Sequence, residues 1–382
     1  MKVNFNQTAQ INNCRPITRF ENNKTKGHRG TTPNFTSDFA MQNCDGLSLA
    51  NFPNVSFRAN CPDMNFLLGQ THRLFCAYSR REMISPYEIR TIYGKLLKRP
   101  NAQSAVNFLQ NYERYMHNIE GQIFSVFKNA DHKGKRDFQN ILQELVPESL
   151  ERLKVKQIEI LNGKNKLIEN MSPEIAEKVK AIRDKTLQSV MDGTFARRSV
   201  LDQIKNIKVE GSDLGRIIKL YQHWYKLPSS SKDFDAFVVK YAKESHDTIA
   251  KRLLSTAVAT IEHVKPQSRG GENKLGNFLL VSAEFNNERD TMPLQEYMML
   301  NSDIDIKGNI QKYIDDVIKE IHRGKSGLAN RSWYPKALQE TIGAETGGEF
   351  VPSIDALNLT KAQKRENNFS QKLSTRYIVF HK

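Results

Sequence analysis

Residues 261–289, "IEHVKPQSRGGENKLGNFLLVSAEFNNER", contain the pattern that decides the fold of this chain. A short β-branched run ends at Glu262 and His263, a polar loop with two adjacent glycines follows, and a second apolar run leads into a pair of asparagines. Two short apolar runs joined by a glycine-containing polar stretch are typical of two paired strands. The segment from Glu284 through Arg289 can begin a short helix. The stretch therefore predicts strand, loop, strand and helix in that order.

The same stretch contains side chains suited to phosphodiester hydrolysis. This reaction needs a base to deprotonate water, a hard cation on the scissile phosphate and stabilisation of the departing oxyanion. His263 can accept a proton near neutral pH. The carboxylate of Glu262 and the amide oxygens of Asn277, Asn286 and Asn287 are the kind of ligand that magnesium prefers.

The spacing of these residues resembles the HNH endonucleases, the ββα-metal nucleases whose motif is D/E-H-h-x-P-x-S-x-G-G-x-N, a central Asn, and N-x-x-K/R. Glu262 and His263 open the motif, Asn277 follows His263 by 277 − 263 = 14 positions, Asn286 follows by another 286 − 277 = 9, and Arg289 comes three later. The loop matches at Pro266, Ser268, Gly270, Gly271 and Asn273. So many matches at fixed offsets are far more specific than a lone short motif.

The resemblance implies a ββα-metal fold and a role for each matching residue. It assigns His263 as the general base, Glu262 and Asn286 as ligands of Mg²⁺ or Mn²⁺, and Asn277 as the residue that holds the loop orienting His263. Asn287 is the rival metal ligand, and we prefer Asn286 because only Asn286 satisfies both offsets. The implied reaction is hydrolysis of DNA, most readily the double-stranded form, to 3′-hydroxyl and 5′-phosphate ends.

Four residues are expected to contact the substrate. Arg289 would grip a phosphate through its guanidinium group, and Lys265, Ser268 and Arg269 would contact the nucleic acid from the loop. Gly270 and Gly271 would permit backbone turns that a side chain obstructs.

The sequence departs from the motif's usual form in ways that affect the site. The first ligand is Glu where Asp is commoner, although Glu-His versions of the family exist. No cysteine pair lies nearby, so we expect no zinc and a hydrophobic brace made by the flanking helices. Adjacent residues of a regular strand point to opposite faces, so Glu262 and His263 can serve one site only where the strand ends or distorts.

Two other interpretations remain open. The chain could be a noncatalytic nucleic-acid-binding protein that keeps an HNH-like fold, or a helical partner-binding scaffold with an incidental surface hairpin whose asparagines favour turns. Composition favours a polyanionic partner, because 57 Lys and Arg against 42 Asp and Glu give a formal net charge of +15. No apolar run suggests a signal sequence or a membrane span, so we expect a cytoplasmic location and no membrane partner.

The rest of the chain is predicted to be mainly helical. Ser85 with Pro86, and Ser172 with Pro173, form N-cap and first-turn pairs that begin helices. A stripe from Phe234 to Leu253 and the segment "KGNIQKYIDDVIKEI" (residues 307–321) also have helical periodicity. The expected fold class is mainly α with a small α+β module. The predicted segments are a disordered Asn-rich region (1–82), a helical region (83–228), the HNH module (229–300), C-terminal helices (301–345) and a polar tail (346–382).

Overall fold

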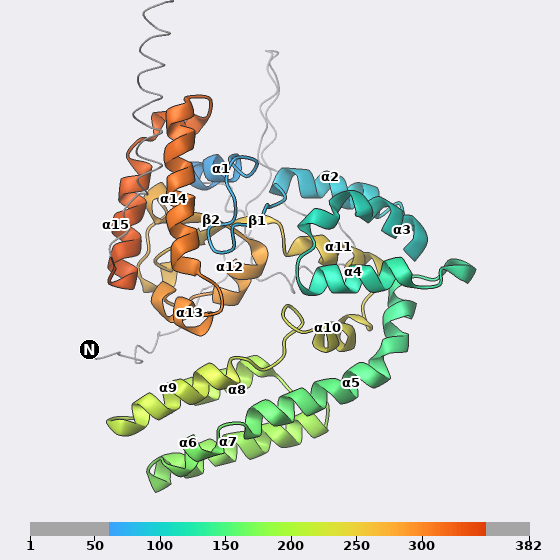
Figure 1. Ribbon diagram of the computed structural model, residues 1–382, viewed down its shortest axis with the longest axis vertical. Coiled ribbons are helices and arrows are strands. Elements are labelled where there is room, and N and C mark those ends of the chain that lie inside the picture. The colour runs from blue at the N-terminus through green and yellow to red at the C-terminus, as the bar shows by residue number, and fades with distance from the viewer. Residues whose placement is uncertain (1–60, 349–382) are drawn as a thin grey trace, which may run out of the picture.

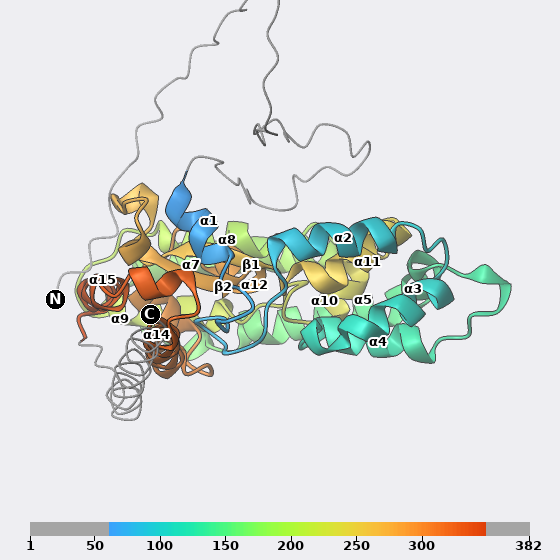
Figure 2. The same cartoon turned by 90° about the horizontal axis from the view of Figure 1, so that it is seen from above.

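The computed structural model describes residues 61–348 of the 382 in the chain. This part is mainly helical with one small antiparallel sheet of two strands, as the sequence predicted. Its buried apolar side chains form three clusters: the hairpin core (residues 67–83 and 259–342), the N-terminal helical core (84–142 and 237–257) and the arm core (161–227). Figures 1 and 2 place the hairpin core and the N-terminal helical core side by side.

Each core is built from elements that are distant in the sequence. The hairpin core contains α1 (Pro62–Leu68), β1 (Ala259–His263), β2 (Phe278–Ser282), α12 (Ala283–Arg289), α13 (Leu294–Leu300), α14 (Ile306–Arg323) and α15 (Tyr334–Thr346). The N-terminal helical core contains α2 (Pro86–Leu96), α3 (Ala102–Leu109), α4 (Ile119–Asn129), the first part of α5 (Phe138–Asn162), α10 (Phe234–Tyr241) and α11 (His246–Ser255). The arm core contains the end of α5, α6 (Asn165–Glu169), α7 (Pro173–Met191), α8 (Arg197–Lys205) and α9 (Ser212–Trp224).

The predicted helix starts are confirmed. α2 begins at Pro86, and the Ser85 side chain accepts a hydrogen bond from the Tyr87 backbone. α7 begins at Pro173 as predicted, although the Ser172 side chain makes no capping hydrogen bond. α14 covers the predicted C-terminal helix. The stripe from Phe234 to Leu253 is instead divided into α10 and α11, because Ser245 caps a new helix by accepting a bond from Thr248 N.

Part of the predicted disordered region is folded. Residues 61–82 form α1 and a connection whose Leu67, Leu74, Cys76 and Tyr78 are buried in the hairpin core. The Ala77 backbone N–H also donates to Leu280 O in β2 (3.0 Å). The sequence prediction was wrong here because this short segment takes its order from tertiary contacts and has no periodicity of its own. Residues 1–60 and 349–382, the other predicted irregular parts, lie outside the described residues.

The segment predicted as the nuclease module contributes to two of the observed cores. α10 and α11 were placed in that module, but their apolar faces pack in the N-terminal helical core. α13, α14 and α15 contribute apolar side chains to the hairpin core. The Tyr334 hydroxyl also donates to Phe278 O on β2 (2.9 Å). The brace around the hairpin is thus hydrophobic and helical, as expected, although α1 and the C-terminal helices supply most of it.

The hairpin and its helix follow in the predicted order. β1 pairs antiparallel with β2 from Ala259 opposite Ser282 to His263 opposite Phe278, and α12 starts directly after β2. Every residue of β2 is buried, which agrees with its continuous apolar sequence. Within residues 61–348, no helix is both long and apolar enough to cross a lipid bilayer.

Candidate functional site

His263 lies at the end of β1, where the strand gives way to the polar loop. Its ring packs edge-on against Phe278, the residue opposite it in the register, with ring centroids 4.9 Å apart. The side chain is partly exposed, and its Nε2 lies 2.8 Å from Asn273 Oδ1. The contacts with Phe278 and Asn273 fix the position of the imidazole at the surface of the hairpin.

Asn277 joins the two ends of the loop. Its Oδ1 accepts a bond from Lys265 N (2.8 Å), and its Nδ2 donates to Lys265 O (3.1 Å) and to Glu272 O (3.0 Å). Its backbone oxygen accepts from Val264 N (2.9 Å). A buried amide that uses its donor and its acceptor on the main chain fixes the path of that chain. These contacts are the ones that the predicted loop-holding role of Asn277 requires.

The two adjacent glycines meet two different needs of the loop. Gly270 has φ +82°, in the left-handed region that glycine adopts without strain. A Cβ at Gly271 would lie 1.8 Å from Lys265 O, so only glycine fits the observed approach of the backbone. Both positions agree with the expectation that a side chain would obstruct the turn.

Glu262 is placed differently from its neighbour. Its side chain is buried, and Oε1 forms an ion pair with Arg289. Burial raises the pKa of Glu262 to about 8, while the guanidinium of Arg289 acts to lower it. The partly exposed imidazole of His263 and this buried carboxyl group follow the alternation of side chains along a strand.

Arg289 requires a correction to its predicted role. The side chain is fully buried, with 0% of its surface exposed. Besides Glu262, it donates to His263 O (2.7 Å) and Val264 O (2.7 Å), and it lies 3.4 Å from the Tyr78 hydroxyl. A guanidinium enclosed in this way cannot reach a phosphate at the surface. Arg289 instead ties α12 to the end of β1, directly beneath the backbone of His263.

The two candidate asparagine ligands occupy different positions on α12. Asn286 is partly buried, and its Nδ2 donates to Ile261 O on β1 (3.4 Å). Its amide oxygen is therefore the atom that can serve as a ligand. Asn287 is exposed and borders a cleft on another side of α12. Asn286 and Arg289 are three residues apart and share the helix face that contacts β1.

The predicted loop contacts lie at or near the surface. Ser268 and Arg269 are exposed, and Lys265 is partly exposed. The Arg269 guanidinium is 3.9 Å from Glu345 of α15, a long contact between partly exposed groups. The loop thus places cationic and hydroxyl groups on the same surface as His263, where a polyanion could reach them.

The donor chemistry of Glu262 and Asn286 fits a hard divalent cation. Oε2 of Glu262 is buried and has no hydrogen-bond partner among the described residues. A buried carboxylate oxygen without a hydrogen-bond partner is a position at which a bound cation can supply that partner. No group of three or more His, Cys, Asp or Glu residues in the described part could hold a metal, but magnesium often takes only one or two protein carboxylates and keeps water and phosphate.

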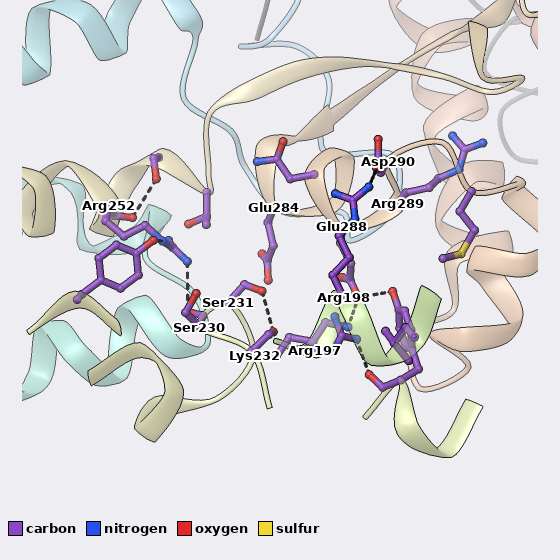
Figure 3. Close-up of a pocket in the computed structure, with 18 of the residues that line it drawn as sticks. Arg197, Arg198, Ser230, Ser231, Lys232, Arg252, Glu284, Glu288, Arg289 and Asp290 are labelled. Atoms are coloured by element: carbon purple, nitrogen blue, oxygen red, sulfur yellow. Dashed lines mark hydrogen bonds and ion pairs between the residues drawn. The ribbon is translucent and has the colours of Figure 1, made fainter. Parts of the chain in front are cut away.

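A cleft of about 690 Å³ adjoins α12, lined also by α8 to α11 and the serine-rich segment before α10. In Figure 3, Glu288 points from α12 into this cleft, where it pairs with Lys232. Arg198 pairs with Asp290 across it (3.1 Å). His263 does not line the cleft. The cleft therefore borders the hairpin and its helix without containing the candidate base.

Sequence reasoning missed two residues of the site. Tyr78 contacts Arg289 from a segment that was predicted to be disordered, and nothing in its local sequence indicates this partner. Asn273 was recognised as part of the motif but was given no role, although it contacts His263. Its position in the motif was the available signal. Comparison with family models, curated proteins and solved structures found no match to this chain.

Proposed function

We propose that this protein is an HNH-type endonuclease that hydrolyses phosphodiester bonds in DNA with a divalent metal and with His263 as general base. The observation that carries the proposal is the arrangement of β1, β2 and α12, in which the Asn277-bonded loop holds His263 at a strand end on the surface. The motif spacing supports the same assignment. A plain surface hairpin does not account for a buried asparagine that bonds both ends of its loop.

In the proposed mechanism, the imidazole of His263 takes a proton from the attacking water. Asn273 and Phe278 hold the ring in place, and Asn277 holds the loop that carries Asn273. The nearby loop cations, Lys265 and Arg269, bind phosphates of the nucleic acid. A positioned general base contributes about a hundredfold to ten-thousandfold to the rate of such a reaction.

Glu262 and Asn286 would hold the metal, through Oε2 and the amide oxygen. A bound Mg²⁺ or Mn²⁺ would polarise the scissile phosphate and stabilise the charge that develops on its oxygens. Arg289 is a positioning residue in this scheme. It engages Oε1 of Glu262 and the carbonyl groups of His263 and Val264, and so fixes the carboxylate relative to the end of β1.

The burial of Glu262 with Arg289 favours the second candidate, a noncatalytic nucleic-acid-binding protein with the same fold. A carboxylate that is neutralised by an internal arginine can serve structure alone. The two candidates share the hairpin and the basic surface, and differ only in whether His263 transfers a proton. Cleavage separates them directly.

The test is incubation of the purified full chain with supercoiled plasmid, with magnesium, with manganese and with excess chelator. We expect nicked or linear product with either metal and none with chelator. His263→Ala should lower the cleavage rate by about a hundredfold or more, with unchanged affinity for duplex DNA. Asn286→Ala should impair cleavage more than Asn287→Ala. Equal cleavage by wild type and His263→Ala would remove His263 as the base, and the absence of cleavage with every metal would favour the noncatalytic candidate.

A further inference from the structure

A second pocket lies at the surface of the arm formed by the end of α5 and by α6 to α9. It is between the connection from α5 to α6 and the C-terminal part of α9, and has a volume of about 770 Å³. Its lining includes four lysines and one histidine and carries no carboxylate side chain. It consists of Asn162, Gly163, Lys164, Asn165, Lys166, Leu167, Lys219, Gln222, His223 and Lys226. We call Lys164, Lys166, Lys219 and Lys226 the pocket lysines; all of them are exposed.

The pocket lysines differ from other lysines of the same arm in their charge environment. Lys156 pairs with Asp233 (2.7 Å), and Lys178 pairs with Glu174 (2.5 Å). Among residues 61–348, none of the pocket lysines has an acidic side chain within ion-pair distance. Four lysines around one pocket, with no carboxylate of the described part of the chain paired to them, create a positive electrostatic potential that attracts an external anion.

The C-terminus of α9 accounts for only part of this cluster. Cations are favourable near the last carbonyl groups of a helix, and Lys219, His223 and Lys226 lie at or just after the last turns of α9. Lys164 and Lys166 come from a different segment, before and within α6, and gain nothing from the α9 terminus. Their presence opposite the end of α9 concentrates the positive charge.

His223 is packed against the backbone of the pocket at Gly163. A Cβ on Gly163 would lie 2.7 Å from its Nε2, so glycine is needed for the ring to pack there. This Nε2 is buried and has no hydrogen-bond partner among the described residues. The pKa of His223 is lowered below its ordinary value, first by burial and further by Lys164 and Lys226, against an opposing backbone bond to Ile160.

We propose that this pocket binds the phosphate backbone of DNA as a second contact, separate from the loop around His263. The choice of DNA as the polyanion rests on the proposed nuclease function and on the net charge of +15. An anionic membrane fits the pocket less well. Leu167 is its one apolar lining residue, whereas surfaces that bind membranes usually combine cations with apolar side chains that enter the lipid.

The experiment measures binding of the full chain to a duplex of about 30 base pairs in chelator, so that no cleavage occurs. The test variant is Lys219→Gln with Lys226→Gln, and the matched control is Lys180→Gln with Lys185→Gln. The control changes net charge equally, at exposed positions of α7 outside the pocket. Each phosphate contact contributes about 0.9 to the slope of log affinity against log salt. The test variant should reduce this slope by about 2 and the affinity by roughly tenfold, and the control should change both much less.

Two further readouts bear on the proposal. Duplex DNA should raise the pKa of His223, followed by NMR of the imidazole, because bound phosphates offset the charge of Lys164 and Lys226. Equal DNA binding by the test and control variants would overturn the proposal. Binding to anionic phosphatidylserine vesicles that requires the pocket lysines, with unchanged DNA binding, would also overturn it.

The outcomes separate this proposal from the nuclease function. Plasmid cleavage by the wild type together with equal DNA binding by both double variants would retain the nuclease function and reject the pocket. Loss of duplex binding in the test variant, with no plasmid cleavage by the wild type, would retain the pocket and reject the nuclease.

Discussion

Replacement of Arg289 by methionine tests whether this residue is a buried structural tie or a phosphate contact. Methionine keeps an unbranched side chain of similar length and removes the charge. The change leaves Glu262 buried without its cation and removes the donors to His263 O and Val264 O. Breaking a buried ion pair by removal of one partner costs about 3–5 kcal/mol. We expect Arg289→Met to lower the free energy of unfolding by an amount in that range at pH 8 and above, where Glu262 is ionised and paired with Arg289.

The assay is urea unfolding of the full chain, followed by circular dichroism, for Arg289→Met, Glu262→Gln and the double variant. The double variant should recover part of the loss, because no unpaired charge then remains in the hairpin core. DNA binding in chelator is measured in parallel. If Arg289 were a phosphate contact, the single variant would bind DNA more weakly at unchanged stability.

The pH dependence gives a second check. The pKa of Glu262 is raised from 4.5 to about 8 by burial, so the native state retains a proton that the unfolded chain releases. The resulting stability is full below pH 4.5 and is lost as pH rises through about 8. Arg289 opposes this rise in pKa, so Arg289→Met should lose more stability at pH 8 than at pH 4.5. A loss below about 1 kcal/mol at pH 8, where a breakage cost of several kcal/mol is expected, would refute the reasoning.

The remaining predictions concern the loop, a second buried acid and the basic surface. Asn277→Ala removes three side-chain hydrogen bonds. The variant should lose about 1–3 kcal/mol of unfolding free energy, measured by thermal unfolding, and should cleave plasmid more slowly although His263 is intact. Wild-type values in both assays would contradict the loop-holding role. Burial first, and then the charge of Glu120, raise the pKa of Glu284 to about 7. The stability that this proton contributes is therefore full below pH 4.5 and is lost as pH rises through about 7. Glu284→Gln should flatten the pH dependence of the unfolding free energy in this window, and an unchanged pH dependence would show that another group titrates there. Duplex binding by the wild type should weaken steeply between 50 and 200 mM salt, because cation release drives association; a salt-independent affinity, measured by fluorescence anisotropy, would favour the partner-binding scaffold.

The sequence predicted the local structure around the candidate site well. The order of strand, loop, strand and helix, the starts of α2 and α7, and the helix α14 all follow from patterns in neighbouring residues. N-caps, first-turn prolines and apolar periodicity act over one or two turns, so they can be recognised without the tertiary structure. The need for glycine at positions 270 and 271 was predictable for the same reason, because a tight turn is a local constraint on the backbone.

The sequence failed where order comes from distant contacts. Residues 61–82 have no regular periodicity, yet Tyr78 and its neighbours are buried against the hairpin. The stripe from Phe234 to Leu253 matched one helix, but Ser245 ends that regularity by capping α11. The segment predicted as the nuclease module contributes to two cores, because α10 and α11 pack in the N-terminal helical core and helical periodicity does not say which core a helix faces.

The sequence alone determined which residue types stand at which spacing, and therefore the proposal that His263 and three asparagines belong to one nuclease-like motif. Only the tertiary structure decided which of these side chains are exposed. Glu262 and Arg289 are 27 residues apart and meet in the hairpin core, and Tyr78 reaches Arg289 across 211 residues of chain. The N–H groups of a guanidinium can bind a phosphate at the protein surface or a carboxylate in the protein interior. The packing of α12 on β1 encloses Arg289, and no local sequence pattern encodes this burial. Because it is buried, Arg289 links α12 to the end of β1 and does not contact substrate.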